Sequence, residues 1–282
     1  MGESLLQLQD VSFQYPDGTL ALKNISLTFP KHKKIAILGN NGSGKSTLML
    51  HLNGILKPKS GTLYYKGYRY SYRKKEIEKI RKQVGIVFQN PDTQLFSTDV
   101  FQDIAFGALN IWKNEQDAKP FIDRAIKLMN VEEFLEKPVH FLSYGQKKRV
   151  ALAGVLAMDP EVIVLDEPTA GLDHYYIRLM SQSLDHIFNS GKTIILSTHD
   201  IDFAYEWADL FIVMSEGQVL QVGDHEMIFS NDSLIEKAHL QKPWMTMIYE
   251  KLKEVNEIVN ESNYPTKKEE IIELLQKVGG NR

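Results

Sequence analysis

The chain has 282 residues, of which 43% are hydrophobic and 24% charged, so it can bury a large α/β core with an insertion or a tail, and it is neither disordered nor collagen-like nor a coiled coil. Its 33 Lys and Arg residues against 36 Asp and Glu residues give a net charge of -3, which provides no overall basic field for nucleic acid. The absence of cysteine excludes disulfides, thiolate metal sites and cysteine nucleophiles.

Strands are predicted over residues 4–30, where apolar and polar residues alternate on both sides of a turn at 16–18. A short apolar run at 35–38 then leads into a glycine-rich loop, and an amphipathic helix is predicted at about 45–55. Residues 69–83 are strongly basic, and a solvated helix face explains them better than a membrane or partner contact.

Three more apolar runs follow, at 85–88, 162–165 and 193–196, and helical patterns separate them. Such runs are typical of strands that are buried on both faces of a largely parallel sheet. In these sheets ligands bind beyond the carboxyl ends of the strands. The glycine-rich loop follows the first run, and polar residues follow the others: Gln89, Asp166, Glu167 and His199. We therefore expect one site at a single edge of the sheet.

From Asp99 to Val139 the pattern is helical without a strand signal, and we interpret this part as an all-helical insertion. After an apolar run at 211–214, Gly217 predicts a hairpin, and a tail begins at about Ser230. The tail carries two apolar helical stripes: Met247, Ile248, Leu252, Val255 and Val259, then Ile271, Leu274, Leu275 and Val278. These stripes either form a dimerisation element or pack back on the chain's own core. No segment approaches the ~18–20 apolar residues of a membrane span.

The glycine-rich loop matches the phosphate-loop pattern G-x-x-x-x-G-K-[ST], with the preceding strand and following helix that this motif requires. Its glycines let several N–H groups point into one concavity that suits a polyphosphate, and the helix adds its positive N-terminal end. Lys45 is expected to reach the terminal phosphates and the Ser46 hydroxyl to ligate Mg²⁺. A glycine-rich turn with an incidental lysine is the less favoured interpretation. The candidate nucleotide-binding residues here are Gly39, Asn40, Asn41, Gly42, Ser43, Gly44, Lys45, Ser46 and Thr47.

Asp166 and Glu167 end the third apolar run, which would hold them rigidly at the sheet edge. Asp166, nearer the strand, suits the magnesium shell, whereas Glu167 suits orienting or deprotonating an attacking water. Gln89 and His199 are candidate γ-phosphate sensors, although each could be an ordinary turn or structural residue. Tyr15 could stack on a purine base, although aromatic residues in early strands are mostly core. The candidate catalytic residues are thus Glu167, His199 and Gln89, and the candidate metal ligands are Ser46, Gln89 and Asp166.

A further helix is predicted to start at residues 142–146, Leu-Ser-Tyr-Gly-Gln. Ser143 is a good N-cap residue, and this alone would explain it. A second helix N-terminus with a small residue and Gly145 could equally hold phosphate. The residues themselves do not decide between these two interpretations.

Taken together, the chain from about Leu5 to Phe229 resembles the ATP-binding cassette of ABC transporters. The resemblance is carried by an ordered series of segments: 39–47, 88–96, 142–146, 147–158, 165–173 and His199. The segments 88–96 and 147–158 are most similar to the cobalt/nickel-type ATPases of energy-coupling factor (ECF) importers, often called CbiO.

The resemblance implies an α/β fold of the P-loop NTPase class. It would have a RecA-like, mostly parallel sheet core with an N-terminal antiparallel β subdomain, an inserted helical subdomain and a small C-terminal helical extension. The implied ATPase domain is 1–230 with the insertion at about 99–158, and the extension is 231–282, the candidate dimerisation element.

The same resemblance implies an ATPase that uses ATP and Mg²⁺ and works peripherally at the cytoplasmic face of the cell membrane. Such cassettes form head-to-tail dimers, with themselves or with a homologous ATPase, and each ATP lies between the phosphate loop of one subunit and the signature segment 142–146 of the other. The implied membrane partners are an integral ECF transmembrane subunit, docked near Gln89 and the 99–139 insertion, and a substrate-binding membrane subunit. Nucleic acid is not an expected partner.

Several residue roles follow from the resemblance alone. Ser143, Gly145 and Gln146 would act in trans on the γ-phosphate, Asp173 would communicate across the dimer, and Tyr15 would stack on adenine. Two residues depart from the family's pattern. Tyr144 replaces the more usual glycine of the signature, and its side chain must point away from the phosphate, whereas His174 replaces a common proline.

The implied cargo is cobalt or nickel, and the alternative is an ECF ATPase that serves vitamin uptake. A soluble, non-transport ABC ATPase acting on nucleic acid or ribosomes is less favoured, because those proteins generally carry two cassettes or a long coiled coil. A P-loop kinase or GTPase is disfavoured because the chain has no Asn-Lys-x-Asp guanine-reading element.

Overall fold

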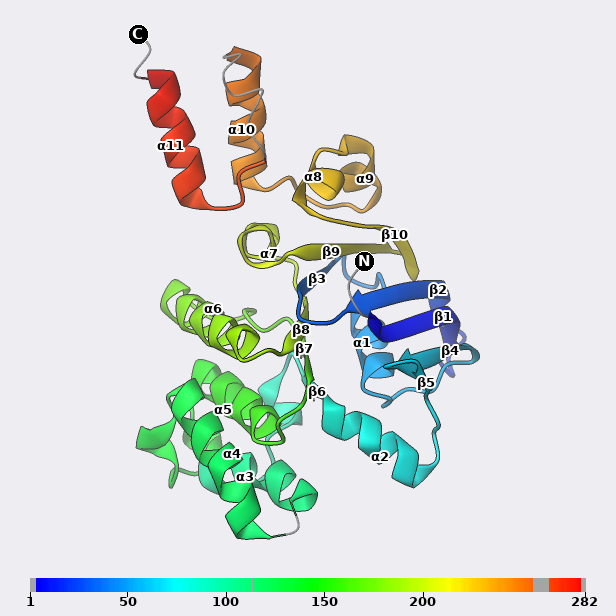
Figure 1. Ribbon diagram of the computed structural model, residues 1–282, viewed down its shortest axis with the longest axis vertical. Coiled ribbons are helices and arrows are strands. Elements are labelled where there is room, and N and C mark those ends of the chain that lie inside the picture. The colour runs from blue at the N-terminus through cyan, green and yellow to red at the C-terminus, as the bar shows by residue number, and fades with distance from the viewer. Residues whose placement is uncertain (1–3, 113, 256–263, 280–282) are drawn as a thin grey trace.

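Two sheets and the helices around them make up the computed structural model, which describes residues 4–112, 114–255 and 264–279 (Figure 1). The smaller sheet has four antiparallel strands in the order β2-β1-β4-β5. Its strands are β1 (Ser4–Gln14), β2 (Leu20–Pro30), β4 (Ser60–Tyr65) and β5 (Tyr68–Arg69). The predicted turn joins β1 to β2, where the Asp17 carboxylate accepts the Thr19 N–H at 2.9 Å. The expected antiparallel subdomain is therefore confirmed.

The larger sheet has six strands in the order β10-β9-β3-β8-β7-β6. They are β3 (Lys34–Leu38), β6 (Val84–Val87), β7 (Val162–Asp166), β8 (Thr193–Ser197), β9 (Leu210–Ser215) and β10 (Gln218–Gly223). The four predicted apolar runs are β3, β6, β7 and β8, and they pair in parallel. Asp166 pairs with Ser197, and Ser197 with Ile37, so the carboxyl ends of three strands meet at one edge. The predicted hairpin is confirmed by β10, which returns antiparallel to β9.

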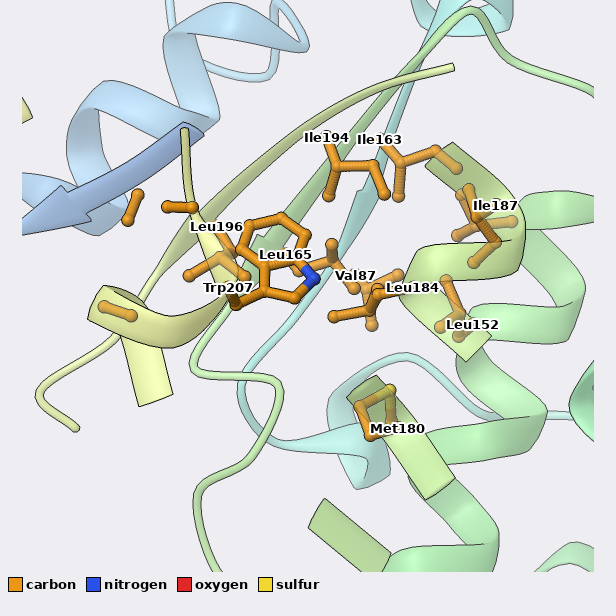
Figure 2. Packing of buried hydrophobic residues seen from close by; sticks show 14 of the residues in the cluster. Val87, Leu152, Ile163, Leu165, Met180, Leu184, Ile187, Ile194, Leu196 and Trp207 are labelled. Atoms are coloured by element: carbon orange, nitrogen blue, oxygen red, sulfur yellow. The ribbon is translucent and has the colours of Figure 1, made fainter. Parts of the chain in front are cut away.

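Both faces of the parallel strands are buried, which is why their sequences carry no polar alternation. Along β3, Ile35 and Ile37 pack into the core beneath the antiparallel sheet, whereas Ala36 and Leu38 pack towards the helices. Figure 2 shows the helix-side core, where Leu165 and Leu196 lie close to Trp207. The sheet is thus fixed from two sides, and the polar residues at its edge are held by a rigid base.

Four helices that lie between strands in the chain pack against the larger sheet. They are α1 (Lys45–Leu52), α2 (Lys74–Gln83), α6 (His174–Asn189) and α7 (Ile201–Trp207). The predicted helix at 45–55 ends three residues earlier than expected. The basic segment forms α2 after β5, and Ile77 is the one buried residue within this helix, so its basic side chains are accessible, as both interpretations of the segment require.

The predicted helical insertion lies apart from the antiparallel sheet (Figure 1). It contains α3 (Val100–Ile111), α4 (Glu115–Met129) and α5 (Tyr144–Leu156), with 3₁₀ turns at Glu132–Phe134 and Val139–Phe141, and a further 3₁₀ turn at Pro91–Thr93 precedes it. An isolated bridge between Asp99 and Pro138 closes its base.

The C-terminal helices begin slightly before the predicted tail. They are α8 (His225–Phe229), α9 (Asp232–Lys237), α10 (Trp244–Val255) and α11 (Lys268–Gly279). The Tyr205 hydroxyl on α7 donates to the Pro265 carbonyl at 2.8 Å, which ties this part to the cassette core. Val259 of the first predicted stripe lies outside the described residues. Within those residues, none of the helices combines the length and the apolar character that crossing a bilayer requires.

Candidate active site

The glycine-rich loop between β3 and α1 lines a cavity at the sheet edge. Gly39 has a φ of 153°, and a Cβ there would overlap the Met214 carbonyl, so a side chain cannot be accommodated. Gly44 has a φ of 100°, and a Cβ there would lie 2.6 Å from the Ala21 carbonyl oxygen. Both glycines are therefore required by the close approach of neighbouring backbone, and the loop keeps the tight curl that the motif predicts.

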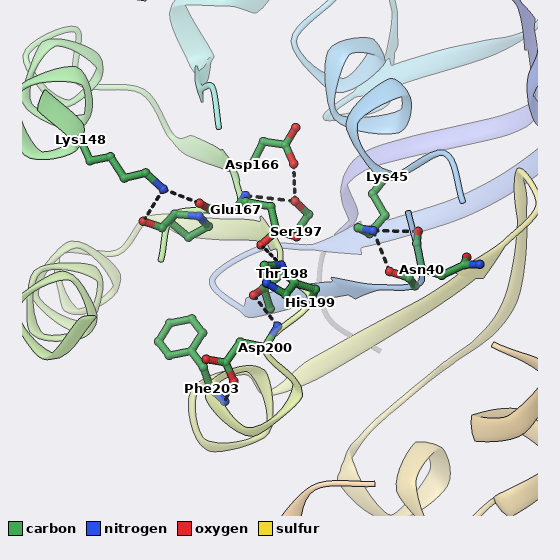
Figure 3. Close-up of polar contacts among 12 residues, drawn as sticks. Asn40, Lys45, Lys148, Asp166, Glu167, Ser197, Thr198, His199, Asp200 and Phe203 are labelled. Atoms are coloured by element: carbon green, nitrogen blue, oxygen red, sulfur yellow. Dashed lines mark hydrogen bonds and ion pairs between the residues drawn. The ribbon is translucent and has the colours of Figure 1, made fainter. Parts of the chain in front are cut away.

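Lys45 is buried at the first position of α1, and its side chain folds over the loop. Its Nζ donates to the Gly39 carbonyl at 2.7 Å and to the Asn40 carbonyl at 3.1 Å (Figure 3). Burial lowers the pKa of Lys45, and the negative charges of Glu167 and Asp166 oppose that shift. The Lys45 ammonium group thus interacts electrostatically with the carboxylates of the acidic pair.

The cavity above the loop has a volume of about 540 Å³ and brings most of the predicted residues together. Its lining includes the whole loop and the other predicted residues of this subunit: Gly39, Asn40, Asn41, Gly42, Ser43, Gly44, Lys45, Ser46, Thr47, Tyr15, Gln89, Asp166, Glu167 and His199. Positive charge and helix N–H groups lie on one side, and carboxylates on the other. A bound anion would therefore be held against the loop and face the acidic pair.

Two features of the lining fit a phosphorylated ligand with a hard cation. The Ser43 Oγ is buried and has no hydrogen-bond partner within the part of the chain that the structure describes. Ser46, Gln89 and Asp166 supply a hydroxyl, an amide and a carboxylate oxygen, which are the donors that Mg²⁺ prefers alongside phosphate oxygens. The residues present therefore suit Mg²⁺ bound together with a polyphosphate.

The acidic pair is positioned by β8. The Ser197 hydroxyl on β8 donates to the Asp166 carboxylate (Figure 3). His199 lies just after β8, and its Nδ1 is 2.8 Å from Glu167 Oε2. Glu167 is buried while the His199 side chain is largely exposed to the cavity. Both residues line the cavity, so the pair faces any ligand that binds there.

Tyr15 reaches the cavity from the end of β1. Its hydroxyl is 3.1 Å from the Thr47 Oγ1, and its ring packs edge-on against Phe13 with the centroids 5.0 Å apart. These contacts hold the ring beside the cavity. Its stacking on a purine base stays a prediction.

The signature residues do not line this cavity. Ser143 caps α5: its hydroxyl accepts the Gln146 N–H at 3.3 Å, and the Gln146 side chain accepts the Ser143 N–H at 2.9 Å. Gly145 follows the cap, and Asp173 caps α6 by accepting the Tyr176 N–H at 2.9 Å. The capping interpretation thus describes the local structure, and the roles in trans stay predictions.

Tyr144, the departure from the family's pattern, points back towards its own subunit. Its hydroxyl donates to the Gln89 carbonyl at 3.2 Å. A Cβ at Gly171 would lie 3.0 Å from the Tyr144 ring, so the ring rests on that backbone. This residue therefore joins the start of α5 to the Gln89 loop and to the loop after β7.

Sequence reasoning missed several residues that shape the site. Thr19, Leu20 and Ala21 line the cavity from the start of β2, and no motif marks them. Ser197 and Lys148 contact the acidic pair from 31 and 19 residues away. Only the position of Ser197 at the end of an apolar run could have indicated its place.

The sequence is similar to that of ATP-binding proteins of known transporters. A family model described as ABC transporter matches residues 22–170. The energy-coupling factor transporter ATP-binding protein EcfA of Methanocaldococcus jannaschii is 45% identical over 254 residues, which are 90% of this chain and 91% of the relative. EcfA2 of Methanospirillum hungatei is 43% identical over 251 residues, which are 89% of this chain and 63% of that longer relative.

Solved structures agree with the sequence comparison. CbiO1 of Clostridium perfringens, described as part of the ABC transporter complex CbiONQ, has a TM-score of 0.74 at 44% identity, over 83% of this chain and 94% of that one. An ATP-binding cassette solved as a dimer in a post-hydrolysis state with ADP and phosphate has a TM-score of 0.72 at 27% identity, over 78% of this chain and 98% of that one.

Proposed function

The chain belongs to the ABC transporter family of ATP-binding proteins, and we propose that it is the energy-coupling subunit of an ECF-type importer, driving a membrane partner by ATP-dependent dimer closure. It is an ABC-type ATPase, similar to the ECF ATP-binding proteins over nine tenths of its length. The observation that carries the proposal is the single cavity in which the phosphate loop faces Gln89, the acidic pair and His199.

We propose that hydrolysis proceeds by in-line attack of water on the γ-phosphorus of ATP, with ADP as the leaving group. Lys45 and the loop N–H groups bind the β- and γ-phosphates and offset the charge that develops on them. Glu167 orients the attacking water and accepts its proton, and His199, hydrogen-bonded to Glu167, contacts the γ-phosphate. Ser46, Gln89 and Asp166 would hold Mg²⁺, which neutralises phosphate charge when bound.

The second half of the site is proposed to come from another subunit. Ser143, Gly145 and Gln146 stand at the N-terminus of α5, outside the cavity of their own subunit, where backbone N–H groups favour an anion. A head-to-tail dimer, with a second copy or with a homologous ATPase, would bring this end to the γ-phosphate of the other subunit. Asp173 would then lie near the dimer interface. ATP favours the closed dimer because only closure lets it contact both halves.

The membrane partner is proposed to dock on an apolar surface of the helical insertion. Phe96, Phe106 and Leu109 are large side chains exposed to solvent, and the rings of Phe96 and Phe106 pack edge-on with their centroids 4.8 Å apart. An exposed apolar cluster of this kind is typical of a protein interaction site. The loop that carries Gln89 leads directly into this surface, so docking and the nucleotide site share one segment. Together these features support a peripheral position at the cytoplasmic face of the membrane.

For the cargo we propose cobalt or nickel, because segments 88–96 and 147–158 resemble the cobalt/nickel-type ATPases, with vitamin uptake as the alternative. Cargo selection would belong to the substrate-binding membrane subunit. Uptake of labelled Co²⁺, Ni²⁺ and vitamins by vesicles that contain the co-purified membrane proteins separates these cases: ATP-dependent Co²⁺ or Ni²⁺ uptake supports the proposal, and vitamin uptake alone contradicts it.

The proposed function is tested by capturing the tagged chain from detergent-solubilised membranes and identifying the integral proteins that accompany it. We expect an ECF transmembrane subunit and a substrate-binding subunit with the wild-type chain. Phe106→Glu with Leu109→Glu should lose both, while ATP binding is unchanged because the cavity is elsewhere. Lys45→Ala should keep both subunits. Capture without any integral protein, from membranes of the source organism, contradicts an importer role.

A further inference from the structure

The backbone of Glu167 adopts a conformation that residues other than glycine rarely adopt. Its φ is 48°, in the left-handed region, which is unfavourable for a residue other than glycine and persists only where the surroundings enforce it. Contacts of the Glu167 N–H group hold this backbone from the side of the sheet. The Glu167 N–H donates to the Ser197 carbonyl at 3.1 Å and to the Ser197 hydroxyl at 3.2 Å, so β8 holds the residue from the sheet.

Lys148 holds the other side of the same turn. It lies near the start of α5 and is only 3% exposed. Its Nζ donates to the Glu167 carbonyl at 2.7 Å and to the Pro168 carbonyl at 3.1 Å (Figure 3). Pro168 has no N–H group of its own, so the turn has one donor fewer than most. One ammonium group therefore clamps two successive carbonyls directly after the acidic pair.

The chemistry of Lys148 fits a clamp better than it fits simple packing. Burying an ammonium group is costly unless its three N–H donors are satisfied. Two of the Lys148 donors bind the carbonyls, and the Nζ also lies over the Tyr144 ring, 5.4 Å from the ring centroid. Burial lowers the pKa of Lys148 to about 8, against the opposing charges of Glu167 and Asp166. A neutral apolar side chain would avoid the cost of burying a charge, but it would leave the Glu167 and Pro168 carbonyls without this donor.

The neighbouring Arg149 provides a comparison on the same helix. It is also buried, and its Nη1 donates to two successive carbonyls, at 3.3 Å from Met129 and 2.8 Å from Asn130. These carbonyls end α4, inside the helical insertion, and do not touch the cavity. Arg149 thus has the same kind of contacts as Lys148, but at a purely structural turn.

We propose that Lys148 is a positioning residue for ATP hydrolysis: by clamping the Glu167 and Pro168 carbonyls, it enforces the left-handed backbone at Glu167. That backbone directs the Glu167 carboxylate towards His199, 2.8 Å away, and towards the cavity. The inference rests on the proposed function, in which Glu167 orients the attacking water. Loss of the clamp leaves the phosphate loop intact but lets the carboxylate leave its reactive position.

The first test compares Lys148→Met with Arg149→Met in steady-state ATP hydrolysis. We expect Lys148→Met to lower kcat at least about tenfold, since a misplacement of about 1 Å can cost as much as 10²-fold. KM should stay within about twofold, because ATP binding to the loop is untouched. Arg149→Met should lower the melting temperature without changing kcat per folded molecule. A kcat of Lys148→Met equal to wild type overturns the proposal, as does an equal loss in Arg149→Met.

The second test separates positioning from general damage by using the Glu167→Gln background. If Lys148 acts through the Glu167 carboxylate, adding Lys148→Met should change the residual single-turnover rate by less than about twofold, because coupled residues are not additive. A further drop as large as in the wild-type background overturns the proposal. Lys148→Arg, which keeps two donors, should restore most of kcat.

Should Lys148→Met fail to fold, Lys148→Gln takes its place in both tests, because its amide is neutral and shorter than the lysine side chain, and the same direction is expected. The parent variant Glu167→Gln separates the two claims. If it hydrolyses ATP at the wild-type rate, the role proposed for Glu167 in hydrolysis is wrong. If it is inactive while Lys148 variants are fully active, only the positioning role of Lys148 is wrong.

Discussion

Among single residues, Lys45 is the one on which we expect phosphate binding to depend most. Its ammonium group lies over the loop, held by the Gly39 and Asn40 carbonyls, and among the residues that line the cavity Lys45 is the one Lys or Arg. Lys45→Ala should weaken ATP binding and lower kcat by about 10²-fold or more, the usual cost of removing one charge-stabilising donor. Equilibrium binding of ATP and phosphate release measure the two effects. Unchanged binding and turnover would contradict the role of the loop.

Substitutions of Tyr144, which replaces the usual glycine of the signature, test whether its hydroxyl and its ring contribute to ATP hydrolysis. Tyr144→Phe removes one hydrogen bond to the Gln89 carbonyl, worth about 1 kcal/mol, so kcat should fall by no more than about fivefold. Tyr144→Gly also removes the ring that rests on Gly171 and faces Lys148, and it should cost more. Steady-state hydrolysis of both variants measures this order. A glycine variant as active as wild type would show that the ring has no role.

At this scale the sequence predicted what local pattern determines and missed what tertiary contacts determine. The phosphate loop, Asp166, Glu167 and His199 were predictable because each stands at the end of a buried run. Lys148 was not, because its partners lie on another element and nothing in α5 distinguishes it from its basic neighbours. The capping role of Ser143 was predictable from the residue type, whereas its role in trans needs a second subunit.

Among elements, α1 carries a pH-dependent contribution to stability through His51. The ring is fully buried: its Nδ1 is 2.7 Å from the Thr47 carbonyl, and its Nε2 has no hydrogen-bond partner among the described residues. The Nδ1 therefore carries the proton, and a second proton on Nε2 would have no acceptor. Burial lowers the pKa of His51 below the ordinary 6.5, although the bond to Thr47 opposes the shift.

The sign of the effect follows from proton linkage. Below pH 6.5 the unfolded chain binds a proton at His51 before the native protein does, so this residue's share of the free energy of unfolding falls as the pH drops through the native pKa. His51→Gln removes this titration. The stability difference between wild type and variant, from urea unfolding, should shrink from pH 7.5 to 5. A difference independent of pH would contradict the account.

The strands show why fold prediction succeeded at the level of elements. Runs at 35–38, 85–88, 162–165 and 193–196 are apolar on both faces because helices and a second sheet cover them, and this pattern is visible without coordinates. The C-terminal helices show the opposite case. Periodicity indicated their apolar faces, but it could not show what covers those faces.

For the whole molecule, the structure bears on both interpretations of the tail. Leu252, Ile271 and Leu274 are buried within the core that includes the cassette, as expected if the stripes pack back. Met247 and Leu275, in the same stripes, are about half exposed. We propose that these exposed side chains contact a second subunit in the absence of nucleotide.

Point substitutions test the tail better than truncation, because truncation would uncover the buried Tyr205. Met247→Glu with Leu275→Glu should shift the wild-type dimer towards monomer in light scattering without nucleotide, since two charges would have to be buried. Met227→Glu, at an equally exposed methionine on α8, is the control and should leave the dimer unchanged. An unchanged dimer in the double variant would show that the stripes serve the chain's own cassette.

The central claim is that one cavity binds ATP, that Glu167 drives its hydrolysis and that ATP closes two subunits head to tail. It is tested most directly by the molar mass and the bound nucleotide of Glu167→Gln in the Met247→Glu, Leu275→Glu background, where the tail no longer joins two subunits, measured together after incubation with Mg²⁺ and ATP. The account predicts intact ATP that co-elutes with a closed dimer, and no dimer closure when Lys45→Ala is added. Hydrolysis at the wild-type rate, or a variant that binds no ATP, would contradict it.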